Sequence, residues 1–418
     1  MGDRIRKWIA VLLAGSILAM IQLVPAGGAV FVRGNIENKE ILGEKETSLQ
    51  QTLHARAWVL MDADSGRILA GKDADTAYPM ASTTKILTCI LALEQGNPDD
   101  WVEVSEKAAS MPDVQLNMRA GERYRLSDLL YSLMLESHND SAVAVAEHIG
   151  GSVEEFAEKM NRKAWEIGCK NVCFVTPNGL DVADADGNEH SASAADMARI
   201  MRYCAFQSPC RETFLEITRT ASRTIQDESG NRSFYLANHN ALLSQCAEVL
   251  SGKTGFTGKA GYCYVGAVKK GGKLLIAALL GCGWPPHKTY KWQDMRKLVT
   301  YGEENFEYQE IEKQGLGKSA VISVENGVMP EVKIRIENGS ADEKTLRVLL
   351  GKDEKIRVRT KIAKAVDAPV KEGMPVGQRD YMIDGIILDS DPVVTDGKVD
   401  RWDFGYAERI VMMKFWLY

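Results

Sequence analysis

Residues 82–94 read STTKILTCILALE, a helix-forming run in which Lys85 is the only charge before Glu94. Its apolar side chains recur at helical spacing, at Ile86, Leu87, Ile90 and Leu91. A Gly-Asn-Pro string at residues 96–98 predicts where the helix ends. A helix that is apolar on nearly every side is expected to be buried in a domain core. Its single lysine is therefore expected to face a cleft or a buried polar site rather than bulk water.

Ser82 and Lys85 form a Ser-x-x-Lys string at the start of this helix. Residues three apart lie on one helix face, so the Lys85 amine is expected within reach of the Ser82 hydroxyl. The unpaired backbone N–H groups of a helix start can hold a developing oxyanion. A lysine can activate a serine nucleophile when burial and a second cation lower its pKa. The structural alternative is a plain N-cap serine followed by a surface lysine.

A second string, Ser137-His138-Asn139, interrupts two predicted helices in a turn. Ser137 can relay a proton between Lys85 and a leaving group, and the Asn139 amide can hold a substrate carbonyl. We expect His138 at the rim of the site rather than as a general base. Taken alone, such a string is more often the C-cap of one helix and the N-cap of the next.

A third string, Lys253-Thr254-Gly255, follows strand-forming residues. Lys253 and Thr254 can bind a carboxylate by charge and hydroxyl, and Lys253 is the candidate for the second cation near Lys85. Gly255 would let a substrate backbone lie against the strand edge. A nucleotide P-loop is excluded because Ala247 stands where its first glycine is required. The chain also lacks a Gly-x-Ser-x-Gly elbow, a His-Glu-x-x-His zinc helix and a dinucleotide Gly-x-Gly-x-x-Gly string.

The pattern around these strings predicts an α+β domain. The predicted strands are 57–61 and 67–70, which form a hairpin, and 249–254, 262–269 and 273–280. The predicted helices beyond the first are 127–136 with a Ser127 cap, 140–148, 152–167 with a capping box of Ser152 and Glu155, and 288–306. This order predicts one antiparallel sheet, built from early and late strands and covered by helices.

Beyond residue 309 the composition changes to short alternating strands, at 320–324, 332–336, 345–350 and 355–359. They predict a small all-β domain without a catalytic constellation. The last residues place apolar side chains along one helical face, at Trp402, Tyr406, Ile410, Met413 and Leu417. An amphipathic helix that lies on a membrane surface is one interpretation, and a terminal strand in a core is the other.

The N-terminus has the pattern of a signal peptide: basic residues, an uncharged run at 8–24, then Pro25 and small residues. An uncleaved membrane anchor is the alternative, and export follows under both. The predicted organisation is a signal peptide (1–29), a flexible lead (30–54), a helix-and-sheet domain (55–307), a small β-rich domain (308–398) and an amphipathic tail (399–418).

The amino-acid composition limits which partners and cofactors the protein is expected to bind. The 418 residues are 45% hydrophobic and 26% charged with a formal net charge of -6, which is ordinary for a globular protein and gives no indication of nucleic-acid binding. Among the eight cysteines, the pairs Cys169/Cys173 and Cys204/Cys210 are close enough in sequence to bridge, but the sequence leaves disulfides open. A zinc site is disfavoured because no Cys-x2-Cys string occurs. We expect no metal or other cofactor.

Residues 57 to about 305 resemble the serine D-alanyl-D-alanine carboxypeptidases, low-molecular-weight penicillin-binding proteins that share a fold with class A β-lactamases. The matching strings are YPMASTTKILT (78–88), the turn at 137–142, NGLD (178–181), NHNAL (238–242), KTGFT (253–257) and AGY (260–262). The small β domain and the tail resemble the C-terminal module and membrane anchor of that family. The resemblance implies the β-lactamase/transpeptidase-like fold.

The resemblance also implies roles for the residues of the three strings. Ser82 would attack the penultimate D-Ala carbonyl of a peptidoglycan stem peptide and expel the terminal D-Ala, with Lys85 as base. Ser137 and Asn139 would form the second wall, and Lys253 with Thr254 would anchor the terminal carboxylate. The oxyanion hole would be formed by the backbone N–H groups of Ser82 and Phe256. β-Lactam antibiotics would acylate Ser82, on the cell-wall side of the bacterial cytoplasmic membrane.

Two residues depart from the family pattern. Many relatives carry histidine where this chain has Asn178, which bears on deacylation, and a small residue where it has His138, which bears on the substrate lip. Asp196 occupies a family acidic position and is expected to be structural.

A D,D-endopeptidase with the same residues remains open. A β-lactamase is disfavoured because no Glu-x-x-Leu-Asn string follows Asn139, and a non-catalytic wall-binding module because Ser82 and Lys85 are both present.

Overall fold

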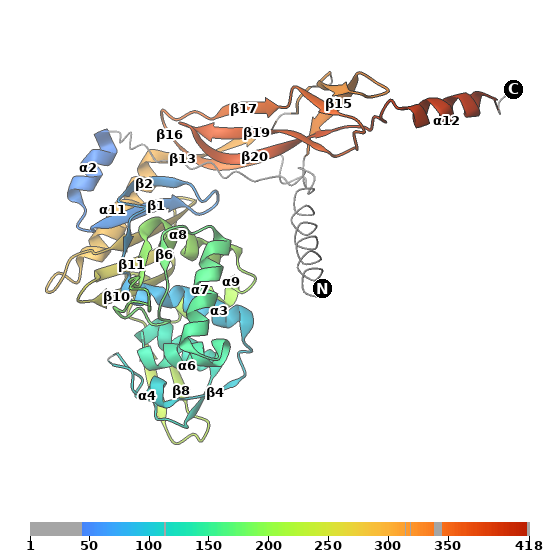
Figure 1. Ribbon diagram of the computed structural model, residues 1–418. Helices are drawn as coiled ribbons and strands as arrows, with labels where there is room; N and C mark the ends of the chain where they lie inside the picture. The colour runs from blue at the N-terminus through green and yellow to red at the C-terminus, as the bar shows by residue number, and fades with distance from the viewer. Residues whose placement is uncertain (1–43, 113, 314, 318, 338–344, 416–418) are drawn as a thin grey trace, which may run out of the picture. The chain divides into compact units, whose positions relative to one another are not determined.

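The structure is a computed structural model that describes residues 44–112, 114–313, 315–317, 319–337 and 345–415 (Figure 1). The predicted signal peptide, residues 1–29, lies outside the described residues, as do residues 30–43 of the predicted lead. The chain packs into two compact units. Of the described residues, 44–313 and 345–356 belong to the larger unit, and 315–337 and 357–415 belong to the smaller one.

The larger unit is built on a five-stranded antiparallel sheet, as the sequence predicts. Its strands, in order across the sheet, are β10 (Val249–Thr257), β11 (Gly261–Lys270), β12 (Lys273–Leu280), β1 (Ala57–Asp62) and β2 (Ile68–Lys72). Early and late strands of the unit meet at the β1–β12 pair, where Ala57 lies opposite Leu280. The sheet thus closes the chain of this unit on itself.

Both faces of the sheet are covered. In β1, Val59 and Met61 pack into the cluster that contains helix α3 (Lys85–Gln95). Trp58 and Leu60 pack into a second cluster with helix α11 (Tyr290–Asn305). Alternate residues of a strand point to opposite faces, so a strand covered on both sides is apolar without interruption. This explains why β1 shows a continuous apolar run in the sequence.

Helices on the α3 side form the bulk of the unit (Figure 1). They are α3, α5 (Leu126–Tyr131), α6 (Asn139–Gly150), α7 (Val153–Ile167), α8 (Ala194–Arg202) and α9 (Arg211–Arg219), with π-helical turns η2 (Ser132–Glu136) and η3 (Tyr203–Gln207). The predicted helices at 140–148 and 152–167 are confirmed, and Ser152 Oγ accepts the N–H of Glu155 as a capping box requires.

The predicted Ser127 cap is wrong. Helix α5 begins at Leu126, and Arg125 before it makes no side-chain cap bond. The backbone N–H groups of Leu126 and Ser127 donate instead to the carbonyls of Asp100 and Pro98. Because these carbonyls satisfy the first helical N–H groups, no capping side chain is needed there.

Short elements connect these layers. They are η1 (Ala81–Thr84), α4 (Glu106–Ala109), α10 (Leu242–Gln245), the three-stranded set β3 (Ala77–Tyr78), β7 (Ser191–Ser193) and β6 (Val172–Cys173), and two ribbons, β4 (Trp101–Glu103) with β5 (Arg123–Arg125) and β8 (Ser222–Gln226) with β9 (Ser233–Ala237). The β8–β9 ribbon and the segment before β5, residues 114–122, support one wall of the candidate site.

The predicted flexible lead is partly wrong, because Glu44–Thr52 forms helix α2. The helix is attached to the edge strand β2: the Gly71 N–H donates to Glu46 Oε1 at 3.1 Å, and Gln50 Nε2 donates to the Gly71 carbonyl at 3.2 Å. Leu49 and Leu53 pack against the same cluster as Trp58. The sequence did not predict this helix because its few anchoring residues lie in a segment that is otherwise polar.

The packing also divides the chain differently from the sequence, which placed residues 345–350 in the small β domain. Strand β16 (Thr345–Gly351) pairs with β13 (Phe306–Glu312) and belongs to the larger unit. Leu349 is buried against the sheet, and its carbonyl accepts Arg67 Nη1 at 2.5 Å. Arg347 is ion-paired with Asp64 at 2.6 Å. The ribbon therefore packs on the β1–β2 hairpin, a contact that local sequence pattern does not encode.

The smaller unit is a six-stranded sheet. Its order is β17 (Arg357–Ile362), β19 (Pro375–Ile383), β20 (Ile386–Thr395), β15 (Glu331–Ile336), β14 (Val321–Glu325) and β18 (Ala365–Asp367). Alternate residues of β14 and β15, among them Ile322, Val324 and Ile334, build its core. The alternation predicted from the sequence is thus confirmed for these strands.

The chain continues into helix α12 (Phe404–Phe415), at the red end of the ribbon in Figure 1. The residues just before it, which the sequence assigned to the tail, are bound to the sheet unit: Val399 bridges Val370, and Arg401 bridges Gly327. Exposed apolar side chains mark the helix at Phe404, Val411, Met412, Met413 and Phe415. Of the helices in the described ranges, none combines the length and apolarity needed to cross a membrane.

All eight cysteines lie in the described part of the chain and are free thiols. Cys204, one member of a pair considered for bridging, is buried with its Sγ 4.0 Å from the Ile86 carbonyl. Cys210 Sγ is directed to the Leu93 carbonyl at 3.4 Å. The five buried cysteines, Cys89, Cys169, Cys204, Cys263 and Cys282, therefore act as small core residues.

Candidate active site

Ser82 lies on the 3₁₀ turn η1, immediately before helix α3. Ala81, which precedes it, has a φ of +49°, an uncommon left-handed conformation for a residue with a Cβ. Two glycines allow other segments to approach this turn. A Cβ on Gly179 would lie 2.0 Å from the Ala81 carbonyl oxygen, and one on Gly255 would lie 2.9 Å from the Ser82 nitrogen. Both positions are therefore restricted to glycine by the turn that carries Ser82.

This changes the reason for Gly255. The sequence suggested that it makes room for a substrate backbone, whereas in the structure it makes room for the chain's own Ser82 turn. Strand β10 consequently passes directly beside the backbone N–H of Ser82. The next residue along β10, Phe256, is 43% exposed, with its ring centroid 4.6 Å from that of Tyr262.

Lys85 is completely buried at the start of α3, as the apolar helix predicted. Its Nζ lies 3.0 Å from Ser82 Oγ, 2.8 Å from Asn139 Oδ1 and 2.7 Å from the Asn178 carbonyl oxygen. The Asn139 amide is oriented with its oxygen toward Lys85, because its Nδ2 donates to the Pro112 carbonyl at 3.1 Å. Two of the three partners of the amine are thus acceptors only, and the third is a hydroxyl.

The environment favours the neutral amine. Burial lowers the pKa of Lys85 well below its ordinary value, and the nearby charge of Lys253 lowers it further, while Asp140 acts in the opposite direction. A neutral amine has two N–H donors and one lone pair. When Asn139 and Asn178 take the two donors, the lone pair is left facing the Ser82 hydroxyl. This is the arrangement that a general base for Ser82 requires.

Ser137 ends the π turn η2 with a φ of +69° and directs its hydroxyl to the opposite lysine. Its Oγ accepts Lys253 Nζ at 3.0 Å, and Lys253 also donates to the Thr254 carbonyl at 2.9 Å. The three contacts of Lys85 are to other residues, so Ser137 is bound to Lys253 rather than to Lys85 as the sequence suggested. Burial lowers the pKa of Lys253 to about 7. Thr254 is half-buried beside it.

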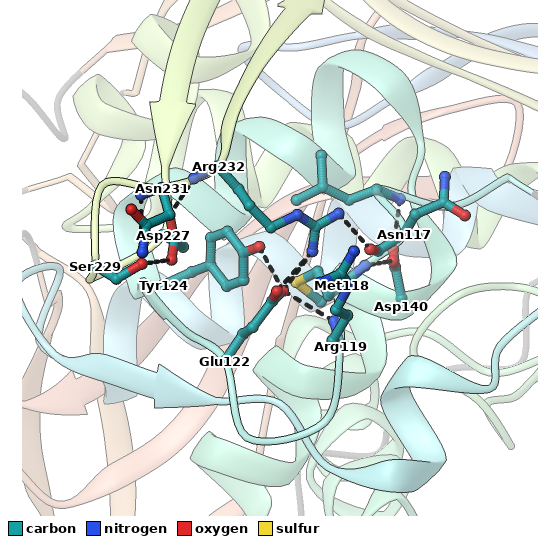
Figure 2. A network of polar contacts seen from close by, with 11 residues as sticks. Asn117, Met118, Arg119, Glu122, Tyr124, Asp140, Asp227, Ser229, Asn231 and Arg232 are labelled. Carbon is teal, nitrogen blue, oxygen red and sulfur yellow. Dashed lines mark hydrogen bonds and ion pairs between the residues drawn. The ribbon is translucent and has the colours of Figure 1, made fainter.

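The wall that carries Asn139 is fastened to the segment before β5. The Asn139 N–H donates to the Val114 carbonyl at 2.7 Å. The neighbouring Asp140 carboxylate accepts the N–H groups of Leu116 at 3.0 Å and Met118 at 3.2 Å. Figure 2 shows Asp140 beside Asn117 and Met118 of this segment, at one end of a longer polar network. The segment is thereby held to the start of helix α6.

At its other end the same segment is held by Arg232, from the β8–β9 ribbon (Figure 2). Arg232 Nη1 is 2.8 and 2.6 Å from the two carboxylate oxygens of Glu122, and Nη2 donates to the Asn117 carbonyl at 2.8 Å. Glu122 also accepts the Tyr124 hydroxyl and the Arg119 N–H, both at 2.9 Å. The wall is therefore fixed from two sides by elements distant in sequence.

The expectation that His138 lies at the rim is wrong. The side chain is 8% exposed, and its Nδ1 lies 2.8 Å from Ser132 Oγ, which in turn is 2.7 Å from Ser141 Oγ. Burial lowers the pKa of His138 to about 4, so the ring is neutral at physiological pH. His138 supports the turn from inside and does not form a lip.

Asn178 takes part through its backbone. Its carbonyl accepts Lys85 Nζ and lies 3.3 Å from Ser82 Oγ, while its side-chain Oδ1 accepts the Leu180 N–H at 3.1 Å. The side chain is therefore turned back on its own loop. Asp196, as expected, is structural: its carboxylate accepts the N–H groups of Lys170 and Asn171.

The structure brings together the residues of all three strings and adds others that the sequence did not reveal. Asp140 is adjacent to Asn139 and was a detectable acidic neighbour. Thr84 and His190 lie 2.8 Å apart although 106 positions separate them, and no local pattern indicates that contact. Among the residues that the structure describes, no group of three or more His, Cys, Asp or Glu side chains is placed to hold a metal ion.

Known families match both parts of the chain. The family described as D-alanyl-D-alanine carboxypeptidase matches residues 44–283, and that described as penicillin-binding protein 5, C-terminal domain, matches residues 309–401.

Individual proteins match over most of their length. The chain is 30% identical to the D-alanyl-D-alanine carboxypeptidase DacF of Bacillus subtilis over 360 residues, 84% of this chain and 87% of that protein. It is 33% identical to DacB2 of Mycobacterium tuberculosis over 250 residues, 59% of this chain and 82% of that protein. Penicillin binding protein 5 from Haemophilus influenzae superposes with a TM-score of 0.65 and 28% identity, covering 84% of this chain and 98% of that one.

Proposed function

Since the chain belongs to the D-alanyl-D-alanine carboxypeptidase family and is a hydrolase of that class, we propose that it works through an acyl-enzyme on Ser82. The observation that carries this proposal is the partner set of Lys85. Two acceptor-only groups occupy the donors of its neutral amine, and the Ser82 hydroxyl lies opposite the lone pair at 3.0 Å. Burial of the amine lowers its pKa well below the ordinary value and so favours the neutral form.

In the first step Ser82 Oγ attacks the carbonyl carbon of the penultimate D-alanine of a stem peptide. Its proton passes to Lys85 Nζ, and the oxyanion is held by the N–H groups of Ser82 and Phe256. The C–N bond then breaks, and the proton reaches the departing D-alanine amine with the Ser137 hydroxyl as relay, which requires that hydroxyl to turn from Lys253 to Lys85 once the substrate is bound. Water attacks the resulting ester in the second step and releases the shortened peptide.

The terminal carboxylate of the substrate is anchored by Lys253 and Thr254. Lys253 already donates to Ser137 and to the Thr254 carbonyl, so an ammonium retains a third donor for a carboxylate oxygen. A bound anion favours the charged form and raises the pKa of Lys253 above its value of about 7 in the free enzyme. Asn139 holds the substrate amide on the opposite wall.

The test is covalent labelling. A fluorescent penicillin is expected to label wild-type protein and Ser244→Ala, an exposed serine on α10, but not Ser82→Ala. Equal labelling of Ser82→Ala would exclude Ser82 as the nucleophile. Release of D-alanine from a monomeric pentapeptide would support the carboxypeptidase assignment. Labelling with cleavage of only a cross-linked dimer would instead favour the D,D-endopeptidase.

We also propose export and attachment of the protein to the membrane surface through α12, so that it acts on the cell-wall side. The support is the apolar surface of that helix, with Phe404 85% and Phe415 83% exposed. Because Val399 and Arg401 are paired with the sheet unit, the deletion that tests this should begin at residue 404. The truncated protein should no longer sediment with phospholipid vesicles. Undiminished sedimentation would contradict the proposal.

A further inference from the structure

We propose that His190 is a positioning residue for the reaction, holding the turn before Ser82 through the hydroxyl of Thr84 and so aiming the Ser82 N–H at the oxyanion. The inference rests on the proposed role of Ser82. It adds a residue far in sequence from the three strings, and one that touches neither substrate nor nucleophile.

The contacts form a single chain of hydrogen bonds. His190 is 3% exposed, and its ring meets Phe174 edge-on at 5.8 Å between centroids. The backbone N–H groups of Val175 and Thr176 lie 2.9 and 3.3 Å from Nδ1. On the other side of the ring, Nε2 lies 2.8 Å from Thr84 Oγ1. Thr84 Oγ1 in turn donates to the Ala81 carbonyl at 2.8 Å.

The direction of every bond in this chain is fixed. A backbone N–H can only donate, so Nδ1 of His190 must be the unprotonated, accepting nitrogen. The neutral ring then carries its proton on Nε2 and donates to Thr84 Oγ1. Because that hydroxyl oxygen receives a proton from His190, its own proton is free to point at Ala81. Burial lowers the pKa of His190 to about 3, which keeps the ring in this neutral form.

The end of the chain is the peptide group that matters for the chemistry. The Ala81 carbonyl and the Ser82 N–H belong to one planar trans peptide, so they point in opposite directions and turn together. A bond that fixes the Ala81 oxygen therefore fixes the Ser82 N–H. Ala81 also has a φ of +49°, an unfavourable left-handed conformation for a residue with a Cβ. The bond from Thr84 offsets part of this cost.

The same histidine reaches the other side of the site. Val175 and Thr176, which donate to it, lead directly into Asn178, whose carbonyl accepts Lys85. His190 thus joins the loop that orients the base to the turn that orients the nucleophile. A histidine that only filled space would make neither a directed chain nor a link between these two segments.

Thr84→Val tests the proposal with little change of shape, and Thr83→Val is its matched control. Thr83 is equally buried in the same turn and donates to the Met80 carbonyl at 2.6 Å, without a histidine partner. We expect Thr84→Val to lower the acylation rate constant with a β-lactam by about 10- to 100-fold, and Thr83→Val to change it by less than about threefold. Thr84→Ser, which keeps the hydroxyl, should restore most of the rate.

Four further measurements separate positioning from general destabilisation. The affinity for a peptide boronic acid, which forms a tetrahedral adduct on Ser82, should fall by the same factor as acylation, whereas KM should stay unchanged. His190→Phe should lower acylation as Thr84→Val does. The double variant should be no worse than His190→Phe alone, because His190→Phe already breaks the chain that Thr84→Val breaks.

Equal acylation by Thr84→Val and Thr83→Val, or additive effects of Thr84→Val and His190→Phe, would overturn the proposal. Wild-type labelling that survives Ser82→Ala would instead overturn the proposed function, so the two failures are distinguishable. If His190→Phe does not fold, the comparison of the two threonine variants still decides the question.

Discussion

The two lysines of the site lie in different surroundings although both are buried. The Lys85 amine is surrounded by protein groups: Asn139 and Asn178 take its two donors, and its lone pair faces Ser82. Lys253 contacts Ser137 and the Thr254 carbonyl, and no third acceptor is placed near its amine within the described ranges. The first region is closed and suits a proton acceptor. The second retains a donor and suits an incoming anion. Saturation of hydrogen bonds, more than burial, distinguishes the proposed base from the proposed anchor.

The largest loss of activity should come from substitution of Lys85, in the closed region. Lys85→Met removes the base, and D-alanine release should fall by about 10²- to 10⁴-fold. Lys273→Met is the control, because Lys273 is also buried but donates to the Glu303 carbonyl at the far end of β12. Steady-state release of D-alanine from a pentapeptide measures both. If the two variants differ by less than tenfold, Lys85 is not the base.

The open region should show a smaller effect with a characteristic pH dependence. Lys253→Met should lower kcat/KM by about 10- to 100-fold, mainly through KM, because a charged hydrogen bond to the substrate is lost. In the wild-type enzyme, kcat/KM should fall as pH rises through about 7, where Lys253 loses its proton. Lys253→Arg, which stays charged, should move that alkaline limb upward. A limb that is unchanged in Lys253→Arg would assign it to another group.

Stability should report the same lysine in the absence of substrate. The folded-state pKa of Lys253, about 7, lies below its ordinary value of 10.5, so the folded state binds fewer protons than the unfolded state between these values. The unfolding free energy of the wild type, relative to Lys253→Met, should therefore rise with pH between about 7 and about 10. Urea denaturation at a series of pH values measures this difference. A difference that falls with pH would contradict the low pKa.

The smallest effect is expected at the outer wall. Arg232→Met breaks the ion pair with Glu122 and the bond to Asn117, which should loosen the segment behind Asn139 and raise KM by about 2- to 5-fold. Arg223→Met is the matched control, since Arg223 lies on the same ribbon and pairs with Asp128 at 2.9 Å. Equal KM values for the two variants would show that the wall does not depend on Arg232.

The buried position of Lys85 and most elements of the larger unit could be predicted from the sequence. Lys85 stood out because a single charge on an apolar helix is costly to bury without a purpose. The five strands of the main sheet and the helices α6 and α7 followed from periodicity and capping. Periodicity and capping are local patterns, and the strands and helices that they predicted are present in the structure.

Other features depended on contacts that sequence does not display. The sequence placed His138 at the rim. Its burial was missed because its partner Ser132 lies on a π turn that the sequence did not indicate. Strand β16 was assigned by its alternation to the small domain, whereas pairing with β13 places it in the larger unit. The link between His190 and Thr84 joins two unremarkable polar residues. In each case the deciding partner is a tertiary neighbour without a local pattern.

Helix α2 has a consequence for the behaviour of the protein in concentrated solution. Strand β2 is the edge of the main sheet, and an exposed edge presents backbone groups on which a second molecule can add a strand. Glu46 and Gln50 occupy the N–H and the carbonyl of Gly71 on that edge, in the way a neighbouring strand would. Side chains of a short helix thus occupy the edge groups on which a second molecule could add a strand.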